Sequence, residues 1–158
     1  MAKYGNYLKT LKGCPFCGNI KSRILLENSG AFLTCNKAPY HKYHLLIIPK
    51  RHVEVIKDLT WEESVDIFAL SLTGIKILNG VGLNDCSILI RDGNILGKSV
   101  KHLHCHIIPN GVLEDTSINS KTRKFLNKKE EKLLKKELKE ILIKNTKNLN
   151  NLTNLSKM

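Results

Sequence analysis

The chain has 158 residues and an ordinary hydrophobic content of 42%, so it is most simply a globular protein with a substantial core. No apolar run approaches the roughly 20 residues of a membrane helix, and the N-terminus lacks a signal-peptide core, so we expect no membrane segment and a cytoplasmic location. Residues 121–158 hold twelve Lys/Arg against four Glu and so carry most of the net charge of +12, which favours a solvated basic tail over a nucleic-acid partner.

Short apolar runs bounded by turn residues predict several β-strands. The first two, separated by Asn28, Ser29 and Gly30, are typical of a hairpin. The predicted strands are residues 22–27, 30–36, 43–50, 86–93 and 101–109. Antiparallel strands around one long intervening helix indicate an α+β fold.

Two helices are predicted. The first begins at Thr60, which forms a capping-box pattern with Glu63, and it ends at Gly80. The second covers residues 128–144, where leucines and isoleucines recur on one side of a lysine-rich segment. The last dozen residues are Asn-rich and are expected to be disordered.

The stretch KHLHCHIIP, residues 101–109, places His102, His104 and His106 at alternate positions. A β-strand has this period, so the three imidazoles are expected on one face of the sheet and the intervening residues on the other. Such a face suits a metal site or a nucleophile, because buried imidazoles without partners are costly.

The histidine stretch, read as GKSVKHLHCHIIP, resembles the signature of the histidine triad (HIT) family. Upstream, NKAPYHKYHLLIIPKRHV resembles the family's Asn/Asp segment, histidine, aliphatic strand and Pro-Lys-Arg-His, so the likeness covers residues 14–109. It implies a five-stranded antiparallel sheet with helices, extended across a homodimer. We expect a HIT domain over residues 1–115 and a basic C-terminal extension over residues 116–158.

The resemblance implies that His104 attacks the α-phosphorus of a nucleotide and forms a covalent nucleotidyl-histidine. A neutral imidazole attacks well near neutral pH when an acceptor holds its other ring nitrogen. His106 and Ser99 are the implied phosphate contacts, and His44 is the implied hydrogen-bonding support of the triad. The resemblance also assigns ribose recognition to Asn36.

Two positions depart from the family pattern. Arg91 and Lys98 replace the Gln or Asn that such hydrolases usually carry near the phosphates. Both residues are cationic, so we expect them to bind nucleotide phosphates and to suit a longer polyphosphate leaving group. A solvent-facing position for both side chains is the alternative.

Cys14 and Cys17 have the spacing of a zinc knuckle but lack a second Cys pair. In the zinc-containing branch of the family the remaining ligands are the histidine of Pro-Lys-Arg-His and the first triad histidine, here His52 and His102. Such a Cys₂His₂ site is closed and structural. A catalytic zinc held by all three triad histidines is the competing interpretation.

The predicted function is cleavage of dinucleoside polyphosphates such as diadenosine tetraphosphate, with release of a nucleoside monophosphate. Nucleoside phosphoramidase activity and phosphorolysis remain open, because these motifs do not encode the second-step acceptor. A zinc-dependent hydrolase and a basic nucleic-acid-binding module are rivals of other classes.

Overall fold

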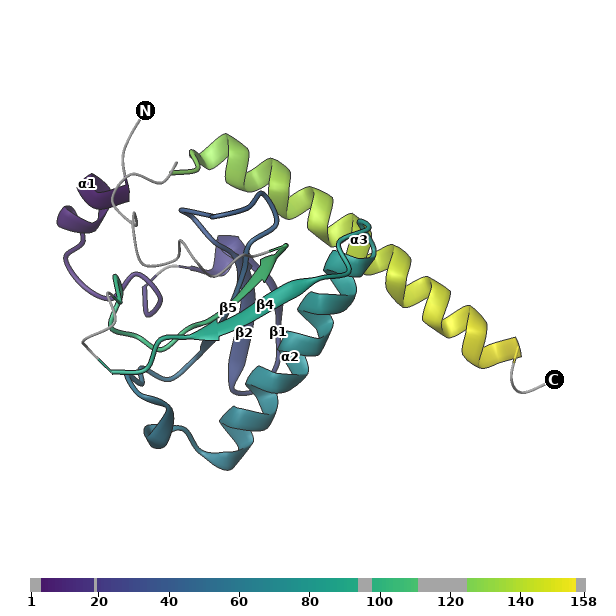
Figure 1. The fold of residues 1–158 in the computed structure, drawn as a ribbon, viewed down its shortest axis with the longest axis horizontal. Coiled ribbons are helices and arrows are strands. Elements are labelled where there is room, and N and C mark those ends of the chain that lie inside the picture. Colours follow the sequence, from purple (N-terminus) through teal and green to yellow (C-terminus); the bar gives the residue numbers. More distant parts are fainter. Residues whose placement is uncertain (1–3, 19, 94–97, 111–124, 156–158) are drawn as a thin grey trace.

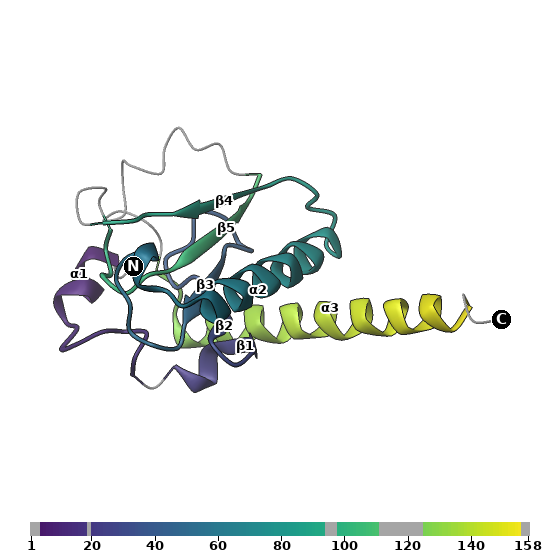
Figure 2. The same cartoon turned by 90° about the horizontal axis from the view of Figure 1, so that it is seen from below.

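The computed structural model describes residues 4–18, 20–93, 98–110 and 125–155, with side chains as far as residue 145. It confirms the predicted five-stranded antiparallel sheet, whose strand order is β1-β2-β3-β5-β4 (Figures 1 and 2). The strands are β1 (Ile24–Glu27), β2 (Ala31–Cys35), β3 (Leu45–Pro49), β4 (Cys86–Ile90) and β5 (Cys105–Pro109). β1 and β4 are therefore the two edges of the sheet.

The hairpin between β1 and β2 is held by its turn residues. The Asn28 side-chain oxygen accepts a hydrogen bond of 2.9 Å from the Ala31 amide. The Gly30 amide donates to the Asp66 carboxylate at 2.6 Å. A Cβ at residue 30 would lie 2.8 Å from that same carboxylate, so a larger residue there would displace the Asp66 side chain.

Helix α2 (Trp61–Asn79) begins with the predicted capping box, in which Thr60 and Glu63 satisfy each other's backbone N–H groups. It packs on β2, β3 and β5, where Ile67, Leu70 and Ile77 join the larger core cluster. A smaller apolar cluster that includes Phe16 and Ile20 forms a second packed group of side chains.

Helix α3 (Lys128–Leu155) continues past the predicted end at residue 144 and through part of the segment expected to be disordered. Leu134 and Leu138 anchor its first half in the core, and its second half projects beyond the sheet (Figures 1 and 2). The sequence did not predict the short helix α1 (Tyr4–Lys9) or the 3₁₀ turns η1 (Lys21–Arg23) and η2 (Ile56–Asp58). Across the described part of the chain, no helix combines the length and apolar character needed to cross a membrane.

The histidine strand is shorter than predicted. The predicted strand over residues 101–109 is wrong in its first half, because β5 begins at Cys105 and both His102 and His104 precede it. β3 pairs with β5 only as far as Ile47, and its last residue, Pro49, has no N–H to extend the ladder. Leu103 instead donates its amide to the Val53 carbonyl at 2.7 Å.

Candidate functional site

All three triad histidines are buried, with 0% exposure for His102, 7% for His104 and 5% for His106. Although His102 and His104 precede β5, the three histidines still alternate with buried apolar residues, namely Leu103 and Cys105. Phe16 packs edge-on against His102 and His104, with ring centroids 5.8 and 5.4 Å away. Each histidine has a different set of partners, so the three rings have different chemistry.

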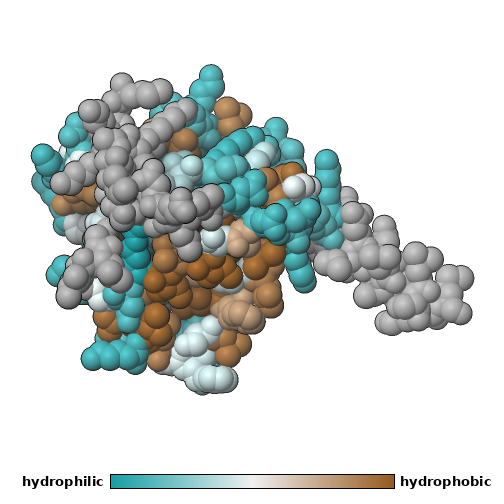
Figure 3. Space-filling model, viewed as in Figure 1, coloured by the Kyte–Doolittle hydropathy of each residue, from teal (hydrophilic) through white to brown (hydrophobic). Residues whose placement is uncertain are grey.

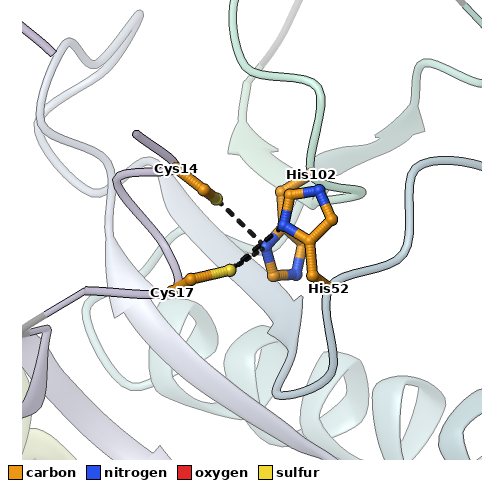
Figure 4. Close-up of side chains that lie close together, drawn as sticks. All are labelled: Cys14, Cys17, His52 and His102. Atoms are coloured by element: carbon orange, nitrogen blue, oxygen red, sulfur yellow. Dashed lines mark hydrogen bonds between the residues drawn. The ribbon is translucent and has the colours of Figure 1, made fainter. Parts of the chain in front are cut away.

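Cys14, Cys17, His52 and His102 form one cluster in which four potential ligand atoms lie within 4.8 Å of one another (Figure 4). Nδ1 of His102 lies 3.3 Å from Sγ of Cys14 and 3.4 Å from Sγ of Cys17. Nδ1 of His52 lies 3.1 Å from Sγ of Cys17. The structure thus brings together the four residues that the family resemblance grouped.

The donor set of this cluster fits zinc. Ordinary Zn–S and Zn–N bond lengths in a tetrahedral site place sulfur and nitrogen about 3.6 Å apart, close to the separations here. Nε2 of His102 lies 3.0 Å from the Pro49 carbonyl oxygen, so this nitrogen donates and the neutral ring keeps its lone pair on Nδ1. Nε2 of His52 faces the Glu54 carboxylate at 3.5 Å. Both histidines therefore have the outer oxygen partner that is typical of metal-ligating imidazoles.

Protonation in the metal-free cluster follows from burial. Desolvation lowers the pKa of His102 to about 4, so its ring is neutral at physiological pH. Desolvation and the adjacent Cys14 thiol raise the pKa of Cys17 to about 11. A bound cation would have to displace the Cys17 proton, which makes metal affinity depend on pH.

His104 presents a nucleophilic nitrogen. Its Nδ1 lies 2.8 Å from the His102 carbonyl oxygen. A carbonyl oxygen only accepts hydrogen bonds, so Nδ1 donates and the neutral ring keeps its lone pair on Nε2. The same carbonyl would stabilise positive charge on the ring if Nε2 formed a bond.

His106 has the opposite tautomer. The Tyr40 amide donates to Nδ1 of His44 at 3.2 Å, which leaves the proton of the neutral His44 ring on Nε2. That nitrogen lies 2.9 Å from Nδ1 of His106, which must accept, so a neutral His106 carries its proton on Nε2. The rings of His104 and His106 are adjacent, with centroids 4.8 Å apart. This combination suits a phosphate group, because the lone pair of His104 can approach phosphorus and the N–H of His106 can donate to a phosphate oxygen.

Asn36 supports this chain of histidines. Its side-chain oxygen accepts from the Ala38 amide at 2.9 Å, and its side-chain nitrogen lies 3.3 Å from both ring nitrogens of His44. The sequence predicted a hydrogen-bonding role for His44. It did not indicate that Asn36 contacts His44.

One pocket brings most of the predicted catalytic residues together. Asn36, Ser99, His104 and His106 all line it. The sequence analysis missed the other residues on its walls, among them Tyr4, Tyr7, Phe16, Arg23 and Lys37. The position of Phe16 between the two cysteines of CPFC was the one available signal for this wall.

Helix α1 closes one side of the pocket. The Tyr4 hydroxyl lies 3.2 Å from the Ser99 hydroxyl, and Tyr4 is buried. Tyr7 packs against Phe125, with centroids 4.6 Å apart, and the ammonium group of Lys37 lies 4.9 Å from both ring centres. Aromatic faces and a cation at the pocket suit a base and a phosphate.

The two predicted cationic phosphate ligands lie elsewhere. Lys98 donates to the Glu54 carbonyl, beside the cysteine cluster, and desolvation lowers its pKa. Arg91 directly follows β4 and does not line the pocket. The structure therefore does not bring these two residues to His104.

Comparisons with known proteins agree with this arrangement. A HIT domain model matches residues 17–111. The adenosine 5'-monophosphoramidase hnt1 of Schizosaccharomyces pombe is 33% identical over 100 residues, which are 61% of this chain and 73% of that protein. The bis(5'-adenosyl)-triphosphatase of Dictyostelium discoideum is 36% identical over 93 residues, 56% of this chain and 60% of that protein.

Solved structures show the same fold. A hypothetical histidine triad nucleotide-binding protein from Sulfolobus tokodaii has a TM-score of 0.67 at 27% identity, covering 83% of this chain and 93% of that one. A Zn-bound histidine triad family protein from Mycobacterium smegmatis has a TM-score of 0.65 at 20% identity, covering 84% of this chain and 94% of that one. The family match, the fold and the histidine geometry agree, and the chain belongs to the HIT domain family.

Proposed function

We propose that this protein hydrolyses nucleotides at the α-phosphorus through a covalent nucleotidyl-histidine on His104. The observation that carries the proposal is the pair of complementary tautomers, a lone pair on Nε2 of His104 beside an N–H on Nε2 of His106. The family membership and the enzyme names of the two relatives support the same reaction class.

The reaction has two displacements. Nε2 of His104 attacks the α-phosphorus, and the bond from phosphorus to the leaving group breaks. The His102 carbonyl stabilises the charge that develops on the ring, while His106 and Ser99 donate to the phosphoryl oxygens. Water then attacks phosphorus, the P–N bond to His104 breaks, and a nucleoside monophosphate leaves.

His44 and Asn36 act around this centre. His44 holds the His106 tautomer as a positioning residue. The second face of the Asn36 amide is the proposed contact for the ribose hydroxyls, since an amide both donates and accepts. Arg91 and Lys98 stay candidates for phosphate binding that would require movement toward the pocket.

Zinc is the proposed structural cofactor, held by Cys14, Cys17, His52 and His102. When bound it supplies a cross-link and takes no part in the reaction. The cross-link would hold the CPFC loop, and with it the Phe16 wall of the pocket, against the segment that carries His104. The three-histidine zinc site is disfavoured because both ring nitrogens of His102 are engaged elsewhere, Nδ1 at the cysteines and Nε2 at the Pro49 carbonyl, and a neutral His106 carries its proton on Nε2.

The favoured substrates are dinucleoside polyphosphates, because a polyphosphate leaves as a stable anion and needs no proton. Nucleoside phosphoramidates are the second candidate, supported by the monophosphoramidase relative. Their amine leaving group must gain a proton. Steady-state assays of diadenosine tetraphosphate and an AMP phosphoramidate, side by side, separate the two substrate classes.

The test of the mechanism uses His104→Ala with His41→Ala as a matched control, since His41 lies outside the pocket. We expect His104→Ala to lower turnover of the better substrate by three orders of magnitude or more, and His41→Ala to leave it unchanged. Substantial turnover by a folded His104→Ala variant would contradict the proposal.

We also propose that the protein is a homodimer, joined through α2 and the edge strand β4. Large apolar side chains are exposed there, including Trp61 at 79% and Phe68 at 64%, and Ile88 of β4 is half exposed. Phe68 and Ile88 line an apolar groove between α2 and the sheet, and Figure 3 shows a continuous hydrophobic area there. An exposed apolar face beside the edge strand β4 fits a second copy of the chain.

Light scattering tests the dimer. We expect about twice the chain mass of 17.9 kDa for the native protein and a monomer for Phe68→Glu. Leu133→Glu, at an exposed apolar position on α3, is the control and should stay dimeric. A native protein that is monomeric at tens of micromolar would contradict this assembly.

A further inference from the structure

A second cavity, of about 740 Å³, lies between α3 and the β2 and η1 segments, and it is strongly cationic. Seven basic side chains line it, against one acidic side chain, Glu131, among the described residues. The basic residues are Arg23, Lys37, Lys128, Lys132, Lys135, Lys136 and Lys139. We refer to this cavity as the lysine groove.

The packing of α3 produces the groove. Leu134 and Leu138 are buried against the sheet, so lysines at neighbouring turns line the flank beside them. The Glu131 carboxylate already pairs with two of these cations, Arg23 at 3.2 Å and Lys37 at 3.9 Å. The remaining positive charge of the groove is not balanced by its own acidic residue.

The cations are crowded enough to affect each other. Desolvation lowers the pKa of Lys37, with Arg23 and Lys128 acting in the same direction. Desolvation also lowers the pKa of Lys135, and Lys139 adds to it. A bound anion would relieve this repulsion between like charges.

The lysine groove adjoins the pocket that contains His104 and His106. Arg23 and Lys37 line both cavities, and Lys37 directly follows Asn36. Ser99 does not line the groove and instead borders a different cavity, beside Cys14 and His52. The groove therefore meets the pocket at Arg23 and Lys37, beside Asn36, and Ser99 does not border it.

This position limits what the groove can hold. On the proposed function, Asn36 contacts the ribose and Ser99 donates to the phosphoryl oxygens, so we place the leaving polyphosphate on the Ser99 side. A dinucleoside polyphosphate then has no phosphate on the Asn36 side. Phosphates that reach the groove must therefore be attached to the ribose on the side away from its 5'-phosphate. The 3'-phosphates of a polynucleotide strand have this position.

We propose that the lysine groove binds a single-stranded oligonucleotide whose 5'-terminal nucleotide occupies the pocket and whose following phosphates lie along α3. This inference rests on the proposed function for its orientation. The stretch of α3 from Lys128 to Lys139 is about 16 Å long at about 1.5 Å per residue, which suits a few phosphates of an extended strand. Tyr7 and Phe125 stand near the junction, where bases can stack on aromatic rings. The basic segment, which the sequence favoured as a solvated tail, thus becomes a binding surface.

Fluorescence anisotropy tests the groove with the full chain and a single-stranded ten-nucleotide DNA that carries a 5'-phosphate and a 3'-fluorophore. The variant is Lys128→Glu, Lys132→Glu and Lys139→Glu together. The matched control is Lys57→Glu, Lys76→Glu and Lys144→Glu together, which changes the net charge equally at lysines outside the groove.

We expect the groove variant to weaken binding at least tenfold at low salt and the control variant less than threefold. The log–log slope of affinity against salt should become shallower by about 0.7 for each phosphate that the groove variant no longer neutralises. Both variants should keep the far-UV circular dichroism spectrum of the native protein, which shows that they are folded. Equally weakened binding in both variants would overturn the groove as a site.

Strand polarity is tested separately. A decamer with a 5'-phosphate should bind more tightly than one with a 5'-hydroxyl and a 3'-phosphate, and AMP should compete only with the first. Equal affinity of the two decamers would overturn the orientation. These measurements need no turnover, so failure of the proposed reaction would be seen in the activity assays and failure of the groove in the binding assays.

Discussion

Nε2 of His44 lies 2.9 Å from Nδ1 of His106, and both rings are almost completely buried. The Tyr40 amide fixes the direction of this hydrogen bond, so His44 donates and His106 accepts. The pair therefore orients an N–H of His106. Four of the six histidines of the chain are held in defined tautomers, His44 and His106 by this contact and His102 and His104 by backbone carbonyls.

Replacing His44 by Phe keeps an aromatic ring but removes the donor to His106. We expect kcat to fall about 10- to 100-fold with little change in KM, because the His106 tautomer is no longer fixed. Steady-state kinetics on diadenosine tetraphosphate measure the effect, with His41→Phe as the control. An unchanged kcat in a folded His44→Phe variant would show that His106 needs no such support.

Zinc content and stability test the cysteine cluster. We expect one zinc per chain by elemental analysis, and its loss in Cys17→Ser together with a fall in melting temperature of about 5–10 °C. Cys86→Ser, at a cysteine outside the cluster, should keep both the zinc and the melting temperature of the native protein. Chelated protein should retain turnover below its melting temperature, whereas complete and immediate loss would favour a catalytic metal.

The α2 capping box predicts a dependence of stability on pH. The Arg51 guanidinium, at 2.7 Å, holds the pKa of the Glu63 carboxyl below its usual value of 4.5. A carboxyl whose pKa is lowered on folding stabilises the protein above its unfolded pKa, and the contribution is lost as the pH falls through the folded pKa. Glu63→Gln should cost about 1 kcal/mol near pH 7 and less near pH 3.

Urea unfolding at several pH values measures this difference. Glu140→Gln on the exposed side of α3 is the control and should change stability near pH 7 less than Glu63→Gln does. A Glu63→Gln variant with the same loss at pH 3 as at pH 7 would mean that packing, not the carboxylate, is responsible.

Leu138 tests how α3 relates to the domain. Its side chain is fully buried in the core shared with α2 and the sheet, so Leu138→Ala should lower the free energy of unfolding by about 2–5 kcal/mol. Leu133→Ala, 58% exposed on the same helix, should change it by less than about 0.5 kcal/mol. Two variants of equal stability would mean that the C-terminal extension contributes nothing to the folded domain.

Local sequence signals predicted much of the fold. The strands follow apolar runs, and Thr60 and Glu63 mark the start of α2 because a capping box is encoded within four residues. The family pattern grouped Cys14 and Cys17 with His52 and His102, and these four side chains do meet. The grouping came from the resemblance, since spacing alone supplied only the cysteine pair.

The features that were missed depend on contacts between distant residues. β5 starts late because of Pro49 in the neighbouring strand, which no alternation of histidines encodes. The six residues of α1 are too few to show a helical period, and Tyr4 meets Ser99 across 95 positions. The lysine groove exists only because α3 turns Leu134 and Leu138 inward, which a count of charges does not predict.

The central claim is that Nε2 of His104 attacks phosphorus. Mass spectrometry of enzyme quenched during turnover of diadenosine tetraphosphate tests it most directly, with the quench at alkaline pH because a phosphorus–nitrogen bond to histidine is acid-sensitive. We expect an AMP adduct on the peptide that contains His104, absent from the His104→Ala protein. Rapid turnover with no adduct on that peptide, together with full activity of His104→Ala, would contradict the account.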